Sequence, residues 1–254
     1  MAVSRSVLTN YLDNHLSIEQ FKDYGPNGLQ VEGTSVIKKI VFGVTICQDL
    51  ILEAITSKAD AIIVHHGLFW QGEPQVVQGI KKNRLKLLLE NNINLLGYHL
   101  PLDCHLTVGN NAQIGQLLPL VDISAHCVGG VKDLLWTAKL IKPQTVEQVK
   151  SLLAGMFGQI PQYLGNDEAS IINNIAWCSG GAQKYIVDAK SLGADLYFSG
   201  EVSEQTMHLA KEYDIHYLTC GHHATERFGV KALAINVEKQ FDVTCEYIDI
   251  NNPV

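Results

Sequence analysis

The sequence predicts an α/β fold in which most neighbouring strands run parallel. Short runs of strand character alternate with helical stretches along nearly the whole chain, and this alternation is typical of strand–helix–strand units. The chain has 254 residues, of which 46% are hydrophobic and 18% are charged. That length and composition suit a folded protein with one large domain or two modest ones.

The first half of the chain contains three strand–helix pairs. The strand at 59–66 is the clearest, because a buried apolar run there ends in two histidines. In chain order, we expect strands at 39–46, 59–66 and 93–98 and helices at 48–57, 80–91 and 110–118.

A break in the pattern lies between Pro119 and Asp133, where Pro, Asp, Ser and a Gly-Gly pair cluster. The alternation then resumes and continues towards the C-terminus. In this half we expect strands at 134–141, 172–178, 195–199, 215–219 and 243–248, and helices at 145–156, 182–192, 203–213 and 224–238.

Two segments of the chain echo each other. ADAIIVHHG (59–67) precedes a helix and then the strand of INLLGYH, while ADLYFSGEV (194–202) precedes a helix and then the strand of IHYLTCGHH. An old duplication would leave such a pattern. Unrelated α/β units also resemble one another, and that explanation is the simpler one.

Charge and composition exclude several classes of protein. The formal net charge of −7 disfavours binding to nucleic acid, which depends on clustered Lys and Arg. The N-terminal residues MAVSRSVLTNYLDNHL are too polar for a secretory signal, and no run approaches about 18 apolar residues. The six cysteines form no CxxC pair, which indicates reduced thiols and no thiolate zinc site. We therefore expect a cytoplasmic protein with neither a membrane nor a nucleic-acid partner.

Three strand ends carry residues of the kinds that bind metals, and open α/β sheets place their sites at the carboxyl ends of strands. At the first, His65 and His66 close the apolar run, and Gly67 permits a bend. Adjacent side chains on a strand point to opposite faces. Two neighbouring histidines therefore serve two neighbouring ions more naturally than a single ion.

The second strand end is LLGYHLPLDCH, in which His99, Asp103 and His105 follow the strand. Pro101 stiffens the loop and fixes the direction of Asp103. A carboxylate beside imidazoles suits borderline and hard divalent ions.

The third strand end is LTCGHHATERFG, in which Gly221 ends the strand and His222 begins a helix. His222 and Glu226 are four residues apart, so both project from one helix face and can grip the same pair of ions, with the carboxylate bridging. His223 points elsewhere, and we assign it to packing or to hydrogen bonding around the ligands.

Simpler explanations compete for the other polar residues. Ser179-Gly180-Gly181 would hold an anion at a helix start, but it lacks a P-loop lysine. Glu201 is either a base or hydrogen-bond acceptor at the site, or a surface carboxylate, and Asn27 either reaches a substrate or belongs to a simple turn. Gly109-Asn110-Asn111 is expected to cap the following helix through Asn. Four isolated histidines are expected to be structural: His15, His126, His208 and His216.

Short motifs spread over almost the whole chain carry a family resemblance. They are PNGLQVEG (26–33), GVT (43–45), IIVHHGLFW (62–70), YHLPLD (98–103), GNNAQIG (109–115), CSGGA (178–182), FSGEVSEQ (198–205) and GHHATER (221–227). Together they resemble the GTP cyclohydrolase 1 type 2 homologue family, also called the Nif-three-like dinuclear metal family. The chain is similar to the short form of that family, which lacks a central inserted domain. Cys47 and Cys104 lie at motif edges and have no assigned role.

The resemblance implies two α/β lobes with a dinuclear metal site in the cleft between them. The first lobe would comprise residues 1–125 and 226–254, and the second residues 126–225. The family also implies a toroidal homohexamer with metal sites facing an inner cavity. Nitrogen and oxygen ligands suit zinc, iron, manganese, nickel or magnesium. The implied ligands of the two divalent ions, bridged by Glu226, are His65, His66, Asp103, His222 and Glu226.

Two classes of function fit these residues. A metal-dependent hydrolase would act on a nucleotide or another small phosphorylated molecule, with His99 or Glu201 as the proton shuttle, and opening of the GTP ring is one version. A non-catalytic metal-binding or scaffold protein forming a ring-shaped oligomer is the alternative. Open coordination beside a substrate-sized pocket favours the hydrolase, and a closed pair of ions favours the scaffold.

Overall fold

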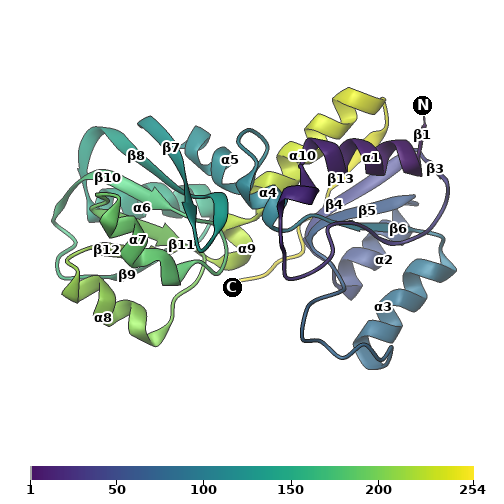
Figure 1. The fold of residues 1–254 in the computed structure, drawn as a ribbon, viewed down its shortest axis with the longest axis horizontal. Helices are drawn as coiled ribbons and strands as arrows, with labels where there is room; N and C mark the ends of the chain where they lie inside the picture. The colour runs from purple at the N-terminus through teal and green to yellow at the C-terminus, as the bar shows by residue number, and fades with distance from the viewer. Residues whose placement is uncertain (1) are drawn as a thin grey trace. The chain divides into compact units, whose positions relative to one another are not determined.

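A computed structural model describes residues 2–254, and their contacts divide the chain into two compact units (Figure 1). Unit 1 takes the described residues up to Leu102 together with Gly229–Asn251. Unit 2 takes Asp103–Phe228 together with Asn252–Val254. Each unit is a mixed α/β structure built around its own sheet.

The sheet of unit 1 has five strands, and four of them are parallel, as the strand–helix alternation predicts. β2 is the exception, because it pairs antiparallel with β6 at the edge of the sheet. The order across the sheet is β13 (Thr244–Tyr247), β4 (Lys39–Thr45), β5 (Ala61–His66), β6 (Asn94–Gly97) and β2 (Gly28–Val31).

Helices lie on both faces of this sheet (Figure 1). α2 (Gln48–Thr56) and α3 (Gly79–Glu90) lie on one face. On the other face lie α1 (Arg5–His15) and the unit 1 part of α10 (Arg227–Phe241), joined by a 2.7 Å hydrogen bond from the Tyr11 hydroxyl to Asn236. Cover on both faces explains why β5 is apolar until its last two residues. The remaining short elements are β1 (Val3–Ser4), η1 (Ile18–Gln20), β3 (Val36–Ile37) and α4 (Leu100–Cys104), which crosses the unit boundary.

The sheet of unit 2 has six strands and mixed direction. β10, β11 and β12 are parallel at its centre, while the outer pairs are antiparallel. The order is β7 (Leu120–Val128), β8 (Val131–Thr145), β10 (Ile171–Trp177), β11 (Leu196–Ser199), β12 (His216–Thr219) and β9 (Gln162–Leu164). The helical elements are α5 (Asn110–Leu117), α6 (Val146–Phe157), η2 (Gln183–Tyr185), α7 (Ile186–Ser191), α8 (Glu204–Glu212) and α9 (His222–Thr225).

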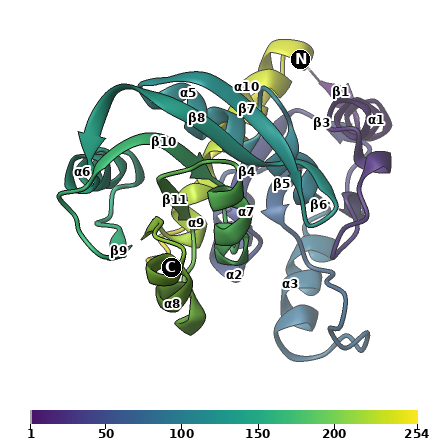
Figure 2. The ribbon, with the colours of Figure 1, turned by 60° about the vertical axis from the view of Figure 1, so that its left-hand side comes forward.

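The β7–β8 hairpin occupies the segment in which the sequence showed a break. Figure 2 shows it as a long curved ribbon. Gly129 and Gly130 both have positive φ, at 58° and 78°, and Val128 pairs directly with Val131. Two left-handed residues in a two-residue loop make the tight turn that suits the twist of a hairpin. The cluster of turn residues at 119–133 is therefore a strand and a hairpin turn, and not a linker.

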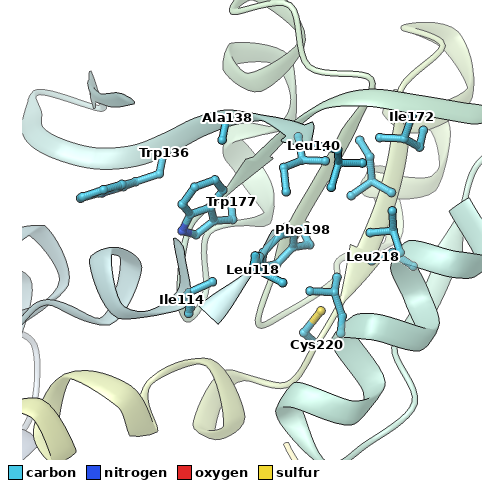
Figure 3. Close-up of a cluster of buried hydrophobic side chains, with 14 of the residues drawn as sticks. Ile114, Leu118, Trp136, Ala138, Leu140, Ile172, Trp177, Phe198, Leu218 and Cys220 are labelled. Atoms are coloured by element: carbon cyan, nitrogen blue, oxygen red, sulfur yellow. The ribbon is translucent and has the colours of Figure 1, made fainter. Parts of the chain in front are cut away.

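The apolar core of unit 2 explains where the first junction between the units lies. Trp177 stacks on Phe198 with ring centroids 6.2 Å apart, and Ile114 and Leu118 pack into the same cluster (Figure 3). Helix α5 and the residue after it thus belong to the core of unit 2. The junction falls between Leu102 and Asp103, whereas the family resemblance suggested a boundary near residue 125.

The two echoed Ala-Asp segments make the same hydrogen bonds in their respective units. Asp60 Oδ2 accepts from the backbone N–H groups of Lys38 and Lys39, at 2.7 and 3.0 Å. Asp195 Oδ2 likewise accepts from two consecutive N–H groups, those of residues 173 and 174, each at 2.9 Å. Each aspartate therefore ties the start of its own strand to the preceding strand of the sheet. The echo in sequence has a structural counterpart that α/β topology alone does not require.

Within residues 2–254 no helix combines the length and the apolar character needed to cross a membrane. All six cysteines are free thiols.

Candidate metal centre

Unit 1 brings three histidines together at the carboxyl ends of β5 and β6. One ring nitrogen from each of His65, His66 and His99 lies within 4.8 Å of the others. The ring centroids of His65 and His66 are 4.5 Å apart, although alternation along a strand would separate them. The His99 ring lies 5.1 Å from that of His65. Three imidazoles at this spacing can offer nitrogen ligands to a divalent cation.

Hydrogen bonds fix the orientation of the first two rings. His65 is fully buried, and its Nδ1 lies 2.9 Å from the carbonyl oxygen of Tyr98. Because a carbonyl only accepts, Nδ1 carries the proton and Nε2 has the lone pair that a metal needs. His66 Nδ1 lies 2.9 Å from the Thr45 hydroxyl.

Gln30 packs its side-chain amide against Gly67 at the end of β5. A Cβ on Gly67 would come within 2.2 Å of Gln30 Oε1. That oxygen accepts from the Leu68 N–H at 2.8 Å, and the Gln30 amide donates to the carbonyl of Pro26 at 2.8 Å. The PNGLQ motif thus holds the turn that follows the histidine pair.

Unit 2 brings together the acidic candidates. Asp103 is 5% exposed and Glu226 is 2% exposed, and oxygen atoms of the two carboxylates lie within 4.8 Å of each other. Asp103 Oδ1 accepts from the Ser179 hydroxyl at 2.7 Å and from the Asn110 amide at 2.9 Å. Two buried like charges at this separation repel each other, so the arrangement suits a cation between them.

His222 lies between two carboxylates. Its Nε2 is 3.1 Å from Glu226 Oε2, and its Nδ1 is 2.7 Å from Glu201 Oε1. Burial lowers the pKa of His222, but the hydrogen bonds and charges of Glu226 and Glu201 outweigh burial and raise the pKa to about 9. The imidazolium therefore supplies a positive charge beside Glu226. A divalent cation at Nε2 would take the place of that proton.

Glu226 lies between two helices and not inside one continuous helix. α9 ends at Thr225 and α10 begins at Arg227, so Glu226 is the residue between two helices. The four-residue spacing still brings its carboxylate to His222. The predicted continuous helix at 224–238 is therefore wrong, because Glu226 has a non-helical backbone conformation (φ −108°, ψ 6°) and separates α9 from α10.

Gly180, which follows β10, leaves room for the carboxylate of Glu226. Gly180 has a φ of +64°, and a Cβ there would lie 2.1 Å from Glu226 Oε1. Its N–H donates to the Thr225 hydroxyl at 3.0 Å, and its carbonyl accepts from the Gly200 N–H at 2.8 Å. In the Ser179-Gly180-Gly181 loop, Ser179 donates a hydrogen bond to Asp103, and Gly180 leaves space for the Glu226 carboxylate. That contact differs from the anion cradle that the loop sequence suggested.

Other polar residues of the chain make hydrogen bonds and ring contacts of their own. His105 Nδ1 accepts hydrogen bonds from the backbone N–H groups of Thr107 and Val108, at 3.2 and 3.1 Å. The ring therefore stabilises the loop that follows it. The backbone N–H of His223 donates to the carbonyl of Val254. Each of the four isolated histidines has a local contact, with Tyr11 for His15, Thr137 for His126, Glu204 for His208 and Tyr163 for His216.

Two polar groups near the site were not anticipated in these roles. Asn110 binds Asp103 instead of capping α5, whose cap residue is Gly109. Asp23 accepts a 2.7 Å hydrogen bond from His99 Nδ1. Asp23 and His99 are 76 positions apart in the sequence, so no local pattern reveals this pair.

Comparison with known proteins identifies the family of this chain. The family model described as Duf34/NIF3 (NGG1p interacting factor 3) matches residues 3–253. The chain belongs to the DUF34/NIF3 family. Proteins named GTP cyclohydrolase 1 type 2 homolog are similar to it over nearly their whole length. The one from Yersinia pestis is 45% identical and the one from Escherichia coli (strain K12) is 43% identical, each over 97% of this chain and 98% of the relative.

Solved structures of relatives share the fold. A structure titled "Structural genomics, protein ybgI, unknown function" superposes with a TM-score of 0.93 at 42% identity, covering 99% of this chain and 100% of the other. The protein TTHA1606 from Thermus thermophilus gives a TM-score of 0.89 at 33% identity, with the same coverage. The mixed α/β architecture is therefore that of the family.

Proposed function

We propose that His65, His66, Asp103, His222 and Glu226 ligate two divalent metal ions. We further propose that the protein is a hydrolase acting on a small phosphorylated molecule. The observation that carries the proposal is the pair of buried carboxylates, Asp103 and Glu226, within 4.8 Å of each other. Oxygen and imidazole ligands without thiolates suit zinc, iron, manganese, nickel or magnesium.

Two ions, when bound, supply Lewis acidity that makes a water molecule more acidic and neutralises developing negative charge. The residues of the chain prepare the ligands for that task. Ser179 and Asn110 hold Oδ1 of Asp103, and Glu201 holds Nδ1 of His222 so that Nε2 faces Glu226. We therefore assign Glu201 to orienting His222 and leave proton transfer to His99.

A cavity in unit 1 supports a phosphorylated substrate. It has a volume of about 480 Å³ and is lined by Thr45 and Trp70, both in contact with His66. Arg84 and Lys81 also line it, together with Glu73, whose carboxylate pairs with Lys81 at 3.4 Å. Ligand pockets typically occupy about 300–1,000 Å³ and combine an apolar lining with a few polar groups. An apolar wall with Arg84 and the Lys81–Glu73 ion pair suits a compound that has a ring system and an anionic group, such as a nucleotide.

The metal part of the proposal is tested by removing charge at constant size. Glu226→Gln should weaken the second ion far more than Asp103→Asn does, because a bridging carboxylate offsets the repulsion between two cations. Elemental analysis after metal loading, beside thermal melting, measures both effects. Retention of both ions at parental affinity in Glu226→Gln would show that the carboxylate does not bridge.

The hydrolase part is tested by screening metal-loaded protein against nucleoside phosphates and simple phosphoesters. Metal-dependent turnover that Glu226→Gln abolishes is the expected result. Two tightly held ions without turnover, and with no exchangeable water by metal spectroscopy, would instead favour the non-catalytic scaffold.

We also propose a homohexamer, following the family resemblance, and a cytoplasmic location, which the six free thiols support. Light scattering that gives a stable monomer at micromolar concentration would rule out the hexamer.

A further inference from the structure

Beyond the ligands, the loop of residues 23–27 holds His99 in one orientation. Asp23 Oδ1 lies 2.7 Å from His99 Nδ1, and Asn27 Oδ1 accepts from the backbone N–H of His99 at 2.8 Å. Both the ring and the backbone of His99 are therefore fixed by the same short loop. His99 itself follows β6, which is remote from this loop in the sequence.

Asp23 is itself fixed by three more hydrogen bonds. Its Oδ1 also accepts from the Tyr24 N–H at 2.6 Å, and its Oδ2 accepts from the Asn27 amide and the Leu100 N–H, each at 2.9 Å. Its side chain is 2% exposed. Burial by itself raises the pKa of Asp23, but the bonds and charge of His99, together with Asn27 and the Tyr24 N–H, bring the pKa below its usual value. The carboxylate is thus a buried anion that only accepts hydrogen bonds.

This geometry decides which nitrogen of His99 carries the proton. A carboxylate acceptor at Nδ1 requires N–H there, so a neutral His99 ring has its lone pair at Nε2. The ring also meets Trp70 edge-on, with centroids 5.1 Å apart, which limits its rotation. With Nδ1 held by Asp23, Nε2 is the nitrogen that His99 can offer to the cluster it forms with His65 and His66.

We propose that Asp23 is the positioning residue of an Asp–His dyad in which His99 Nε2 accepts a proton at the metal centre. This inference rests on the proposed function for its chemical consequence. The oxygen of the attacking water bonds to the phosphorus of the substrate while the bond from phosphorus to the leaving oxygen breaks. The proton that the water releases moves to Nε2 of His99, and the other ring proton stays on Nδ1 of His99, where it donates to Asp23. The carboxylate stabilises the resulting imidazolium, which then returns the proton to the leaving group. Asp23 touches neither the water nor the substrate and acts through His99 alone.

The tautomer can be measured without any substrate. Solid-state nitrogen NMR of histidine-labelled, metal-free protein, assigned by difference from His99→Gln, should show a protonated Nδ1 and an unprotonated Nε2 on neutral His99. The opposite tautomer in the parent protein would overturn the proposal. Since this measurement needs no hydrolysis, it separates a failure of the dyad from a failure of the proposed function.

Asp23→Asn then tests the role of the carboxylate. In this variant the amide can donate to Nδ1, which allows the Nε2–H tautomer, and a Ser–His–Asp triad loses about 10⁴-fold in turnover on the same exchange. We expect a population of Nε2–H on His99, two ions per chain as in the parent, and at least about a 10²-fold loss of any turnover with p-nitrophenyl phosphate. An unchanged tautomer in Asp23→Asn would overturn the proposal.

Two controls complete the design. Asp13→Asn alters another carboxylate of unit 1, which accepts from the Tyr98 hydroxyl at 2.8 Å, and should leave the His99 tautomer unchanged. His99→Gln should retain both ions. If it loses one, His99 is a metal ligand, and the assignment of proton transfer to its Nε2 is wrong.

Discussion

Gly180→Ala is the substitution whose effect follows most directly from the geometry of unit 2. Its Cβ would lie 2.1 Å from Glu226 Oε1, whereas ordinary contacts begin at 3.4 Å. The carboxylate oxygen must therefore retreat by about 1.3 Å, several times the roughly 0.2 Å within which metal–ligand distances are usually held. We expect the metal affinity of the variant to fall by more than about tenfold.

The stability change has two parts. A left-handed conformation costs a non-glycine residue about 1–2 kcal/mol, and Gly180 has a φ of +64°. Overpacking against the buried Glu226 adds roughly 1–3 kcal/mol. Together these cost about 2–5 kcal/mol, and at about 2–4 °C per kcal/mol for a chain of this size Tm should fall by roughly 4–20 °C.

Gly158→Ala is a matched control. Gly158 has a similar φ of +76°, but a Cβ there would meet nothing within 4 Å. The control therefore carries the backbone strain without the clash, partly offset by about 0.4–1 kcal/mol from the lower entropy of the unfolded chain. Melting curves and elemental analysis of both variants after metal loading are the assay. Equal Tm values and equal metal contents for the two variants would refute the claim that the Glu226 carboxylate needs the space left by Gly180.

Three further perturbations probe other parts of the structure. Glu201→Gln should weaken metal binding by about 10–100-fold, because it removes the charge that orients His222, and metal titration followed by calorimetry measures this. Asn94→Ala should lower the free energy of unfolding by about 1–3 kcal/mol in denaturant titrations, because the fully buried amide makes three hydrogen bonds to the backbone. Burial lowers the pKa of His216 below 6.5, so this histidine binds a proton more tightly in the unfolded chain than in the folded one. The free energy of unfolding should therefore fall as the pH drops below 6.5, and His216→Gln should make this pH dependence less steep. A pKa at or above 6.5 for His216 by NMR would contradict this sign.

The central strands could be predicted because parallel strands buried on both faces are apolar throughout. β5 and β11 are buried along almost their entire length, and their bounds agree with the expected ones to within two residues. β7 was missed for the opposite reason. Most of its residues are partly or fully exposed, and Asp122 takes a positive φ of 55° within it, so no apolar run marks the strand.

The first helix was also missed, although the chain does carry signals for it. Ser4 caps α1 by accepting from the Val7 N–H, and Leu8 and Leu12 lie four residues apart on its buried face. Such short amphipathic patterns predict a helix only when the cap and the spacing are considered together.

The candidate site was predictable in its residue types and not in its supporting contacts. The histidine pair and the four-residue His–Glu spacing are local patterns, which a sequence displays. The partners of these groups come from distant segments, as when Ser179 reaches Asp103 across 76 residues. Hydrogen bonds of that range depend on how strands are ordered in a sheet, which no local pattern encodes.

The central claim is the proposal that five side chains ligate two ions, and metal stoichiometry tests it most directly. Elemental analysis and metal titration would compare the parent chain with His66→Gln, Glu226→Gln and the double variant. We predict two ions per chain in the parent, weaker binding in each single variant, and a combined loss that departs from the sum of the single losses, because both residues act on the same ions. A parent chain that never exceeds one ion after loading, or losses from the two variants that simply add, would contradict the account.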